Sequence, residues 1–481
     1  MKFGTCNRVI TVTLLLTLAI PARLAAQAPA PTNHLYQLID LGTLGGPFSN
    51  YSGPSLQVFN NKGTAAAYAN TPAPNPNPNC FVPFNDNDCF VEHPIIWHDG
   101  AVTDLGVLPG GVNGQTDYLA TNGLIAGWSE DGLIDPLLGL PEAHAVLWTQ
   151  SRKIIDLGAL PGGNESLATA MNSGGQVVGF SNNDVPEDPS VSLTGLPTQT
   201  RAFLWQNGAM QDLGTLGGTD GLPFYINERG QVSGFSFTNS DATLSPFFWQ
   251  NGTMTDIGTL GGTFGQPNGL NRRGQVAGLS TLAGDANNHP FFWDRGVLTD
   301  IGTFGGSNGE ADDISDSGMV VGTADFAGDF IHHAFVWKNG VMTDVGVVPG
   351  DSCTNGRAVN SKGQAIGTST NCMGVVQHLF LWESGSIFDL GALILGGTDL
   401  TFQEAFDIND RGEIAARGML PNGEQHAVVL VPASEAEIAA AGALAVAKAA
   451  PAAPRRVATT SRDSAFGGRT RKQYALRSVQ P

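Results

Sequence analysis

A repeat with a spacing of 44 residues constrains this chain more than any other feature. Its core is Asp-aliphatic-Gly, and the copies at Asp212, Asp256, Asp300 and Asp344 follow one another at 44-residue intervals. Such a period is typical of repeat architectures. A residue that recurs at the same position of every unit is expected to serve the packing that all units share. We therefore look for catalytic or binding residues where one unit differs from the others. The full series is Asp40, Asp104, Asp156, Asp212, Asp256, Asp300, Asp344 and Asp389.

Each unit is predicted to contain four short strands. An Asn-x-x-Gly segment such as 271–274 favours a tight turn between the first and second strands, because the Asn side chain can bond its own backbone and Gly tolerates a positive φ. Asn-Gly at 207–208, 251–252 and 339–340 predicts a hairpin between the third and fourth strands. Four strands in 40 to 45 residues are the norm for a β-propeller blade.

The two ends of the repeat array are complementary. Residues 36–42 read as a fourth strand with no third strand before it, and 426–431 read as a third strand with no fourth strand after it. Pairing them would remove two exposed edges. The predicted fold is therefore all-β, a closed propeller of eight four-stranded blades over residues 29–432, whose N-terminal strand completes the last blade. An open β-solenoid would instead need polar capping repeats.

The repeated Trp, Asp and His side chains are interpreted as structural. A Trp at one register of the third strand suits a wedge between neighbouring sheets, with a ligand-binding aromatic cluster as the alternative. Each Asp precedes a turn, where it can accept backbone N–H groups; a ring of cation-binding carboxylates is the alternative. The His that opens the third strand is expected to pair with a polar neighbour. The tryptophans are Trp97, Trp148, Trp205, Trp249, Trp293, Trp337 and Trp382.

The two ends of the chain differ in character from the repeats. Residues 1–28 read as a secretory signal peptide, with a basic start, an apolar run and small residues at 25–28. Residues 433–481 begin with an Ala-rich stretch at 435–450, expected to be a short helix, and continue as a basic tail expected to be disordered. We expect a soluble exported chain, secreted, periplasmic or at the cell surface, with no lipid anchor and no membrane span.

Charge and cysteines narrow the class of partner. The formal net charge is −19 although the tail is basic, so the repeats carry a strongly acidic field that repels nucleic acid. We expect a monomer with an extracellular glycan, peptide or protein ligand.

In an oxidising compartment Cys80, Cys89, Cys353 and Cys372 are expected to form disulfides, and their spacing favours the local pairs 80–89 and 353–372 over a metal site.

The units resemble a known family of repeats. His333-Ala334-Phe335, followed by Trp337 and by an Asp-aliphatic-Gly segment, is similar to the signature of the HAF-repeat family of probable extracellular bacterial proteins. The resemblance covers residues 36–431 and implies secretion. It supplies no catalytic residues.

Departures from the repeat mark the candidate binding surface. Long insertions follow the second strand in units 1, 2 and 3, at 71–92, 130–142 and 182–200, and alternating strands would place them on one face. Loops carry function more often than the scaffold does. Closely spaced Asp and Asn oxygens at 85–88 also suggest calcium, although the segment lacks the Gly and the length of a recognised calcium loop. The candidate binding-face residues are Asp86, Asp88, Glu130, Asp131, Asp184, Glu187 and Asp188.

Unit 6 carries the other departure. Ser315 replaces the turn Asn, and acids gather before and after it, as either a cation site facing a channel or solvated charge. No Gly-x-Ser-x-Gly or His-Glu-x-x-His motif occurs, so the first hypothesis is a binding module and the alternative is an extracellular hydrolase or lyase with a cation near the axis. No cofactor is expected apart from a calcium ion at one of the acidic clusters. The weak metal candidates are Glu310, Asp312, Asp313 and Asp316.

Overall fold

A computed structural model describes residues 35–52, 57–77, 89–190 and 192–445. This part of the chain is almost entirely β, and its strands form successive antiparallel units in sequence order. The predicted signal peptide and most of the basic tail lie outside it. The helix predicted at 435–450 is present as α1 (Glu435–Ala445), up to the last described residue.

Units 2 to 8 follow the predicted four-strand pattern, whereas the sheet of unit 1 has five strands because two short strands, Ser49–Asn50 and Phe59–Asn60, both pair with Thr64–Pro74. Units 4 and 5 together form one eight-stranded sheet, because a single parallel bridge between Leu244 and Phe264 joins them. Unit 1 contains β2 (Ser49–Asn50), β3 (Phe59–Asn60), β4 (Thr64–Pro74), β5 (Phe90–His98) and β6 (Ala101–Asp104); unit 2 contains β7 (Gly114–Leu119), β8 (Ile125–Ile134), β9 (Pro141–Trp148) and β10 (Ile154–Asp156); unit 3 contains β11 (Ser166–Met171), β12 (Val177–Pro186), β13 (Thr198–Gln206) and β14 (Ala209–Asp212). Unit 4 contains β15 (Gly217–Ile226), β16 (Val232–Thr238), β17 (Leu244–Gln250) and β18 (Thr253–Asp256), and unit 5 contains β19 (Gly261–Leu270), β20 (Val276–Leu282), β21 (Asn288–Asp294) and β22 (Val297–Asp300). Unit 6 contains β23 (Gly305–Ile314), β24 (Val320–Phe326), β25 (His332–Lys338) and β26 (Val341–Asp344), and unit 7 contains β27 (Cys353–Val359), β28 (Ala365–Thr370), β29 (Val376–Glu383) and β30 (Ser386–Asp389).

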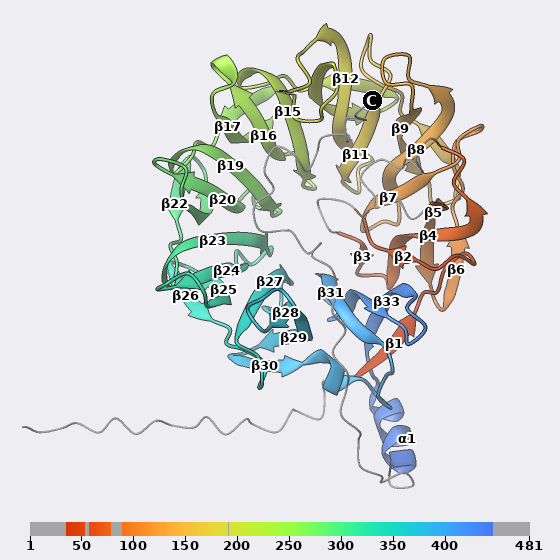
Figure 1. Cartoon of the computed structure of the whole chain (residues 1–481), viewed down its shortest axis with the longest axis vertical. Helices are drawn as coiled ribbons and strands as arrows, with labels where there is room; N and C mark the ends of the chain where they lie inside the picture. Colours follow the sequence, from red (N-terminus) through yellow and green to blue (C-terminus); the bar gives the residue numbers. More distant parts are fainter. Residues whose placement is uncertain (1–34, 53–56, 78–88, 191, 446–481) are drawn as a thin grey trace, which may run out of the picture. The chain divides into compact units, whose positions relative to one another are not determined.

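The last unit combines strands from both ends of the repeat array. It contains β31 (Thr401–Ile408), β32 (Ile414–Met419) and β33 (Gln425–Pro432), and its fourth strand is β1 (Tyr36–Asp40). β1 is antiparallel to β33, with Tyr36 opposite Pro432 and Asp40 opposite Val428, and Figure 1 shows the two strands side by side. The pairing expected between the N-terminal and last strands is confirmed.

The core consists of layers between neighbouring units. Trp293 of unit 5 lies with its ring centroid 4.9 Å from that of Phe248 in unit 4, and Trp337 of unit 6 lies at the same distance from Phe292 of unit 5. Each Trp fills the space between two sheets and is nearly fully buried. These contacts are the wedge packing that the constant Trp register indicates.

The turn asparagines connect each unit to the next. The Asn271 carboxamide oxygen accepts the backbone N–H groups of Arg273 and Gln275 in its own turn, as expected. Its Nδ2 donates to the Ser315 carbonyl of unit 6 at 3.1 Å. The equivalent Nδ2 donations run from Asn172 to Asn227 (3.1 Å), from Asn227 to Asn271 (3.0 Å), from Asn360 to Asn409 (2.9 Å) and from Asn409 to Asn60 (3.0 Å).

Ser315 interrupts this series in unit 6. Its hydroxyl accepts the Met319 N–H group at 3.2 Å and so replaces the Asn oxygen within the turn, but it has no amide that can reach unit 7. Ser315→Asn should therefore add one inter-unit hydrogen bond and raise the free energy of unfolding by about 1 kcal/mol. Chemical denaturation measures this, and Asn271→Ser is the matched reverse change, expected to lower stability by a similar amount. A less stable Ser315→Asn protein would contradict the assignment.

The Gly-Gly pairs of units 4, 5 and 6 begin β15, β19 and β23. Gly306 shows the reason, because a Cβ there would lie 2.5 Å from the Phe326 carbonyl oxygen, so the strands approach too closely for a side chain. The insertions of units 1 to 3 were read as loops, yet they partly extend hairpins, with Pro74 opposite Phe90 and Ile134 opposite Pro141.

Candidate functional site

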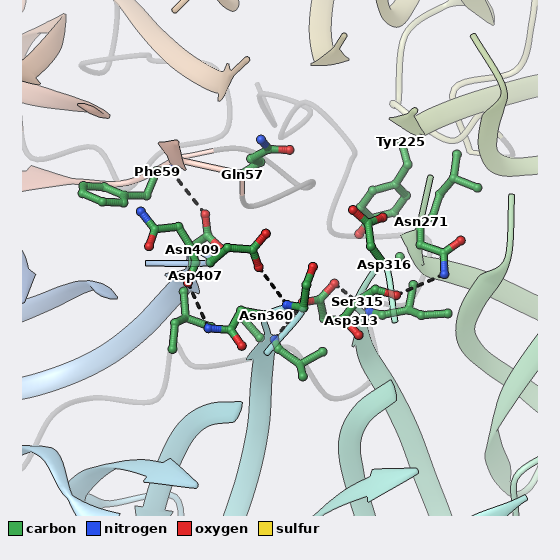
Figure 2. A pocket seen from close by; sticks show the side chains of 18 of the residues that line it. Gln57, Phe59, Tyr225, Asn271, Asp313, Ser315, Asp316, Asn360, Asp407 and Asn409 are labelled. Carbon is green, nitrogen blue, oxygen red and sulfur yellow. Dashed lines mark hydrogen bonds between the residues drawn. The ribbon is translucent and has the colours of Figure 1, made fainter. Parts of the chain in front are cut away.

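A cavity of about 220 Å³ lies where the first strands of the units end in their Asn-x-x-Gly turns. Residues from units 1, 2, 4, 5, 6, 7 and 8 line it. Figure 2 shows Phe59, Tyr225, Asp313 and Asp407, from four different units, around this turn-end cavity. It lies at the turn ends of the strands, whereas the insertions of units 1 to 3 extend the opposite ends.

A β-bulge near the end of the first strand supplies part of the lining. The pairing register shifts by one residue between Ala311 and Asp313 in unit 6, which leaves Asp312 as the extra residue. A bulge redirects a side chain that the regular pleat would place elsewhere. The bulged residues that line the cavity are Asn268, Asp312, Arg357 and Phe406.

Asp313 and Asp407 each connect their unit to the next. Asp313 Oδ2 accepts the Val359 N–H group at 2.9 Å, and Asp407 Oδ2 accepts the Phe59 N–H group at 3.3 Å. The first bond joins units 6 and 7 at the place where Ser315 lacks an amide. These carboxylates therefore have a structural function as well as a place in the cavity wall.

The cavity carboxylates are poorly solvated. Burial raises the pKa of Asp313 to about 6, although backbone N–H groups of Val359 and Ile314 oppose the shift. Burial, together with the charge of Asp313, raises the pKa of Asp407 to about 7. Burial also raises the pKa of Asp312 well above its usual value, and Glu310 adds to this while Arg357 opposes it. Asp312 Oδ2 is buried without a hydrogen-bond partner in the described chain.

Negative charge exceeds positive charge around the cavity. Asp316 forms an ion pair with Arg272, whose Nε lies 3.2 Å from Oδ2. Arg357 lies close enough to Asp312 and Asp313 to lower the pKa of both. The other acids of the cavity wall, Glu228, Asp407 and Asp410, have no basic residue of the wall to neutralise their charge. Aromatic side chains lie among them. The charged lining residues are Glu228, Asp312, Asp313, Asp316, Asp407, Asp410, Arg272 and Arg357, and the aromatic ones are Phe59, Tyr118, Tyr225 and Phe406.

These shifts predict that the ligand-free protein is more stable at pH 5 than at pH 8. A carboxyl group whose pKa is higher in the folded than in the unfolded state binds more protons when folded, so stability falls as pH rises from about 4 through the folded pKa. Asp313 with a pKa of about 6, and Asp117 and Asp407 with pKa values of about 7, act in the same direction. One pKa unit corresponds to about 1.4 kcal/mol, and the three shifts together span several units between pH 5 and pH 8, so we expect a Tm at least about 3 °C higher at pH 5.

Calorimetric melts at the two pH values measure this effect. Asp407→Asn, which keeps an oxygen acceptor for the Phe59 N–H group, should reduce the difference. A Tm that rises between pH 5 and pH 8 would contradict the assignment.

The four metal candidates of unit 6 do not converge on one point. Asp313 is directed to unit 7 and Asp316 to Arg272 of unit 5. In the described chain, the carboxylate, Cys and His groups close enough to share a metal ion are Asp131, Glu142 and His144 of unit 2. The sequence missed this group because its members meet only through the hairpin pairing of β8 with β9.

The predicted binding-face residues have different environments. Asp86 and Asp88 lie outside the described residues. Glu130 is buried, and its Oε1 accepts the Asn113 Nδ2 group at 2.8 Å while its Oε2 accepts the Val112 N–H group at 3.0 Å. Its carboxylate stabilises the loop and does not form an exposed surface. Asp131 and Glu187 are partly buried, whereas Asp184 and Asp188 are exposed.

The repeated Asp and His residues bond to each other. Asp300 Oδ1 accepts the Gly302 N–H group at 2.8 Å, and His289 Nδ1 lies 2.9 Å from Asp300 Oδ2. Unit 3 uses Arg201 in place of the His, and in unit 7 His378 pairs with Asp351. The other His–Asp pairs of this kind are His93–Asp104, His144–Asp156, His333–Asp344 and His426–Asp40.

The cysteines agree with an oxidising compartment. Cys353 and Cys372 form a disulfide with their Cα atoms 5.0 Å apart, as predicted. Cys89 is also disulfide-bonded, and Cys80 lies outside the described residues. Within the described chain, α1 is the one α-helix, and no helix there is long and apolar enough to cross a membrane.

Comparisons with known proteins identify no family. No family model matches the sequence, and no curated protein matches it. Among solved structures, the chain is similar to the β-propeller domain of the Trilobed protease from Pyrococcus furiosus, at 8% identity and a TM-score of 0.39 over 74% of this chain and 98% of that one. It is also similar to dipeptidyl peptidase 4 from Porphyromonas gingivalis, at 9% identity and a TM-score of 0.43 over 78% of this chain and 58% of that one. Neither likeness carries a functional assignment.

Proposed function

We propose that the chain is an exported, closed eight-bladed β-propeller that binds the positively charged side chain of a peptide or surface protein in the turn-end cavity. We also propose that its units are HAF repeats, on the signature at His333-Ala334-Phe335. The single observation that carries the binding proposal is the excess of partly buried carboxylates, with raised pKa values, among aromatic rings in one cavity.

Closure is supported by contacts between the ends of the array. The pairing of β1 with β33 gives the last unit its fourth strand. In addition, Asn409 Nδ2 of unit 8 donates to the Asn60 carbonyl of unit 1, in the way that Asn227 donates to Asn271. The same contact between consecutive units thus recurs between the last unit and the first.

The chemistry of the cavity favours a cation. An ammonium or guanidinium group would give Asp407 a counter-charge. It would also add to the single charge of Arg357 beside Asp312 and Asp313, and it would favour the ionised forms of all three carboxyl groups. Tyr118, Tyr225 and Phe59 offer aromatic faces, which attract cations. An anionic ligand would add to the existing repulsion.

The insertions of units 1 to 3 are a second proposed surface, for a glycan or protein partner. Asn77 Nδ2 donates to Glu130 at 2.6 Å, which joins the first insertion to the second. Asn164 Nδ2 donates to Glu142 at 3.2 Å, and Asn182 Nδ2 donates to Asn164 at 2.9 Å, which joins the second to the third. The three insertions thus form one hydrogen-bonded surface, and a glycan array with the purified protein tests it.

Calorimetric titration with the peptide Gly-Lys-Gly tests the cavity proposal. We expect binding at pH 8 that weakens at pH 5, where the cavity carboxyls gain protons, and no binding of the Nε-acetylated peptide. Asp312→Asn and Asp407→Asn should each weaken binding at least tenfold, whereas Asp184→Asn, an exposed acid of the unit 3 insertion, should leave it unchanged. Equal affinity for the acetylated peptide, or an equal loss with Asp184→Asn, would refute the proposal.

The hydrolase alternative rests on the same carboxyl groups. Asp313 and Asp407 have pKa values of about 6 and 7, which suit general acid–base catalysis near neutral pH. Turnover of a panel of chromogenic glycosides and peptides that is lost in Asp407→Asn would favour this alternative over binding alone.

A further inference from the structure

We propose that the insertion of unit 2 forms a divalent metal site whose ligands are Asp131, Glu142 and His144. The site is separate from the turn-end cavity and does not depend on the proposed binding function. One ligand atom from each of these residues lies within 4.8 Å of the others. Ligands on one octahedral ion at 2.0–2.2 Å are about 4.0–4.4 Å apart when opposed and about 3 Å apart when adjacent, so the three groups would close by about 1–2 Å on binding an ion.

Hydrogen bonds orient each proposed ligand. Asp131 Oδ1 accepts the Leu133 N–H group at 2.8 Å, and Glu142 Oε1 accepts the Asn164 Nδ2 group at 3.2 Å. Each carboxylate therefore keeps its second oxygen for a metal. Such outer partners are typical of metal sites, where they fix the direction of the ligand.

The Nδ1 atom of His144 faces two carboxylates. It lies 3.0 Å from Asp156 Oδ1 and 3.9 Å from Asp131 Oδ2. A metal ion bound to Nδ1 would therefore replace the hydrogen bond to Asp156, and the imidazole proton would lie on Nε2.

The charge around the site has no cationic counterpart in the neighbouring sequence. Between residues 63 and 151 the chain contains no Lys or Arg. Asp135 and Glu165 add two further buried carboxylates, and the charges of Asp135, Glu142 and Asp131 all act on Glu165.

A buried oxygen of the same insertion also lacks a partner. Asp135 is 1% exposed, its Oδ1 accepts the Leu138 N–H group at 3.0 Å, and its Oδ2 is buried without a hydrogen-bond partner in the described chain. A buried carboxylate oxygen in this state is costly unless a cation or a water satisfies it. Asp135 is not one of the three residues whose ligand atoms lie within 4.8 Å of one another, so a water bound to the metal ion would have to reach it.

Other units provide an internal comparison. His333 of unit 6 pairs with Asp344 at 2.9 Å, as His144 pairs with Asp156. In the described chain, only in unit 2 does the His of such a pair lie close enough to two further carboxylates to share an ion with them. The insertion that carries Asp131 and Glu142 makes the difference. Because an imidazole nitrogen joins two carboxylates, we expect Zn²⁺ or Mn²⁺ in preference to Ca²⁺, which favours oxygen ligands.

The test is metal analysis and calorimetric titration of the full mature chain. After treatment with EDTA, ZnCl₂ or MnCl₂ should bind at one site per chain and raise the Tm, while CaCl₂ should bind more weakly. Asp131→Asn, Glu142→Gln and His144→Gln should each weaken binding by 10- to 100-fold. His333→Gln is the matched control, and it should leave metal affinity unchanged.

Several outcomes would overturn the proposal. One is that neither Zn²⁺ nor Mn²⁺ binds at 1 mM. Another is that the three ligand variants leave the metal affinity unchanged. A third is that His333→Gln lowers the metal affinity as much as the ligand variants do. A preference for Ca²⁺ that survives His144→Gln would refute the ligand set. If a variant does not fold, Mn²⁺ bound to the unaltered protein should still show nitrogen hyperfine coupling in electron spin resonance, and its absence would exclude His144 as a ligand.

Discussion

Deletion of residues 35–42 should destabilise the protein by about 5 kcal/mol or more and cause it to aggregate. The deletion removes β1 from the last unit, exposing the hydrogen-bonding edge of β33, and it removes the buried Tyr36 and Leu41 side chains. Each buried side chain is worth about 1.5–3 kcal/mol, and each lost hydrogen bond about 1 kcal/mol. An unpaired edge also templates association with a second molecule. Calorimetry and size-exclusion chromatography measure both effects.

A truncation at the other end of the chain is the control. Deletion of residues 446–481 leaves every described strand in place and should leave the Tm and the elution volume unchanged. An unchanged Tm and monomeric elution after deletion of 35–42 would show that the last unit does not depend on β1. Closure through shared strands would then be wrong.

Loss of the Cys353–Cys372 disulfide should cost about 3 kcal/mol, because the bond closes a loop over a sequence separation of 19 residues. Cys353 begins β27 opposite Thr370, the last residue of β28, and Cys372 follows two residues later. The double variant Cys353→Ala, Cys372→Ser should therefore melt about 3–4 °C lower, with the loss confined to unit 7.

Reduction provides a check that does not depend on substitution. Dithiothreitol should lower the Tm of the unaltered protein. In the double variant it should leave the hydrogen-exchange rates of the β27 and β28 amides of unit 7 unchanged. Peptide mapping without reduction should join Cys353 to Cys372. A bond from Cys353 to Cys80 or Cys89 would contradict the assignment.

The strand pattern was predictable because short-range chemistry determines it. Asn207, Asn251 and Asn339 adopt positive φ values of 53°, 51° and 52°, as the Asn-Gly hairpin signal requires. The Asp-x-Gly bonds join residues two apart, so sequence spacing alone suggests them. The pairing of β1 with β33 followed from counting strand types, although the strands are almost 400 residues apart.

The cavity and the metal-binding group were not predictable from these signals. Asp312 lines the cavity because of a bulge, and one extra residue in a strand leaves no clear mark in the hydrophobic pattern. Asp313 raises the pKa of Asp407 although the two residues belong to different units and are far apart in the sequence. The acids of unit 6 stand out in the sequence as a departure from the repeat. Their contacts do not, because Asp316 pairs with Arg272 of unit 5 and Asp313 bonds to Val359 of unit 7.

The central claim is that the turn-end cavity binds a positively charged group, and a crystal structure of the protein grown with Gly-Lys-Gly at pH 8 tests it most directly. We predict that the lysine ammonium lies among the carboxylates of Asp312, Asp313 and Asp407, with Asp312 Oδ2 as one of its hydrogen-bond acceptors. An empty cavity with the peptide bound on the insertions of units 1 to 3, or with no peptide bound at all, would contradict the claim.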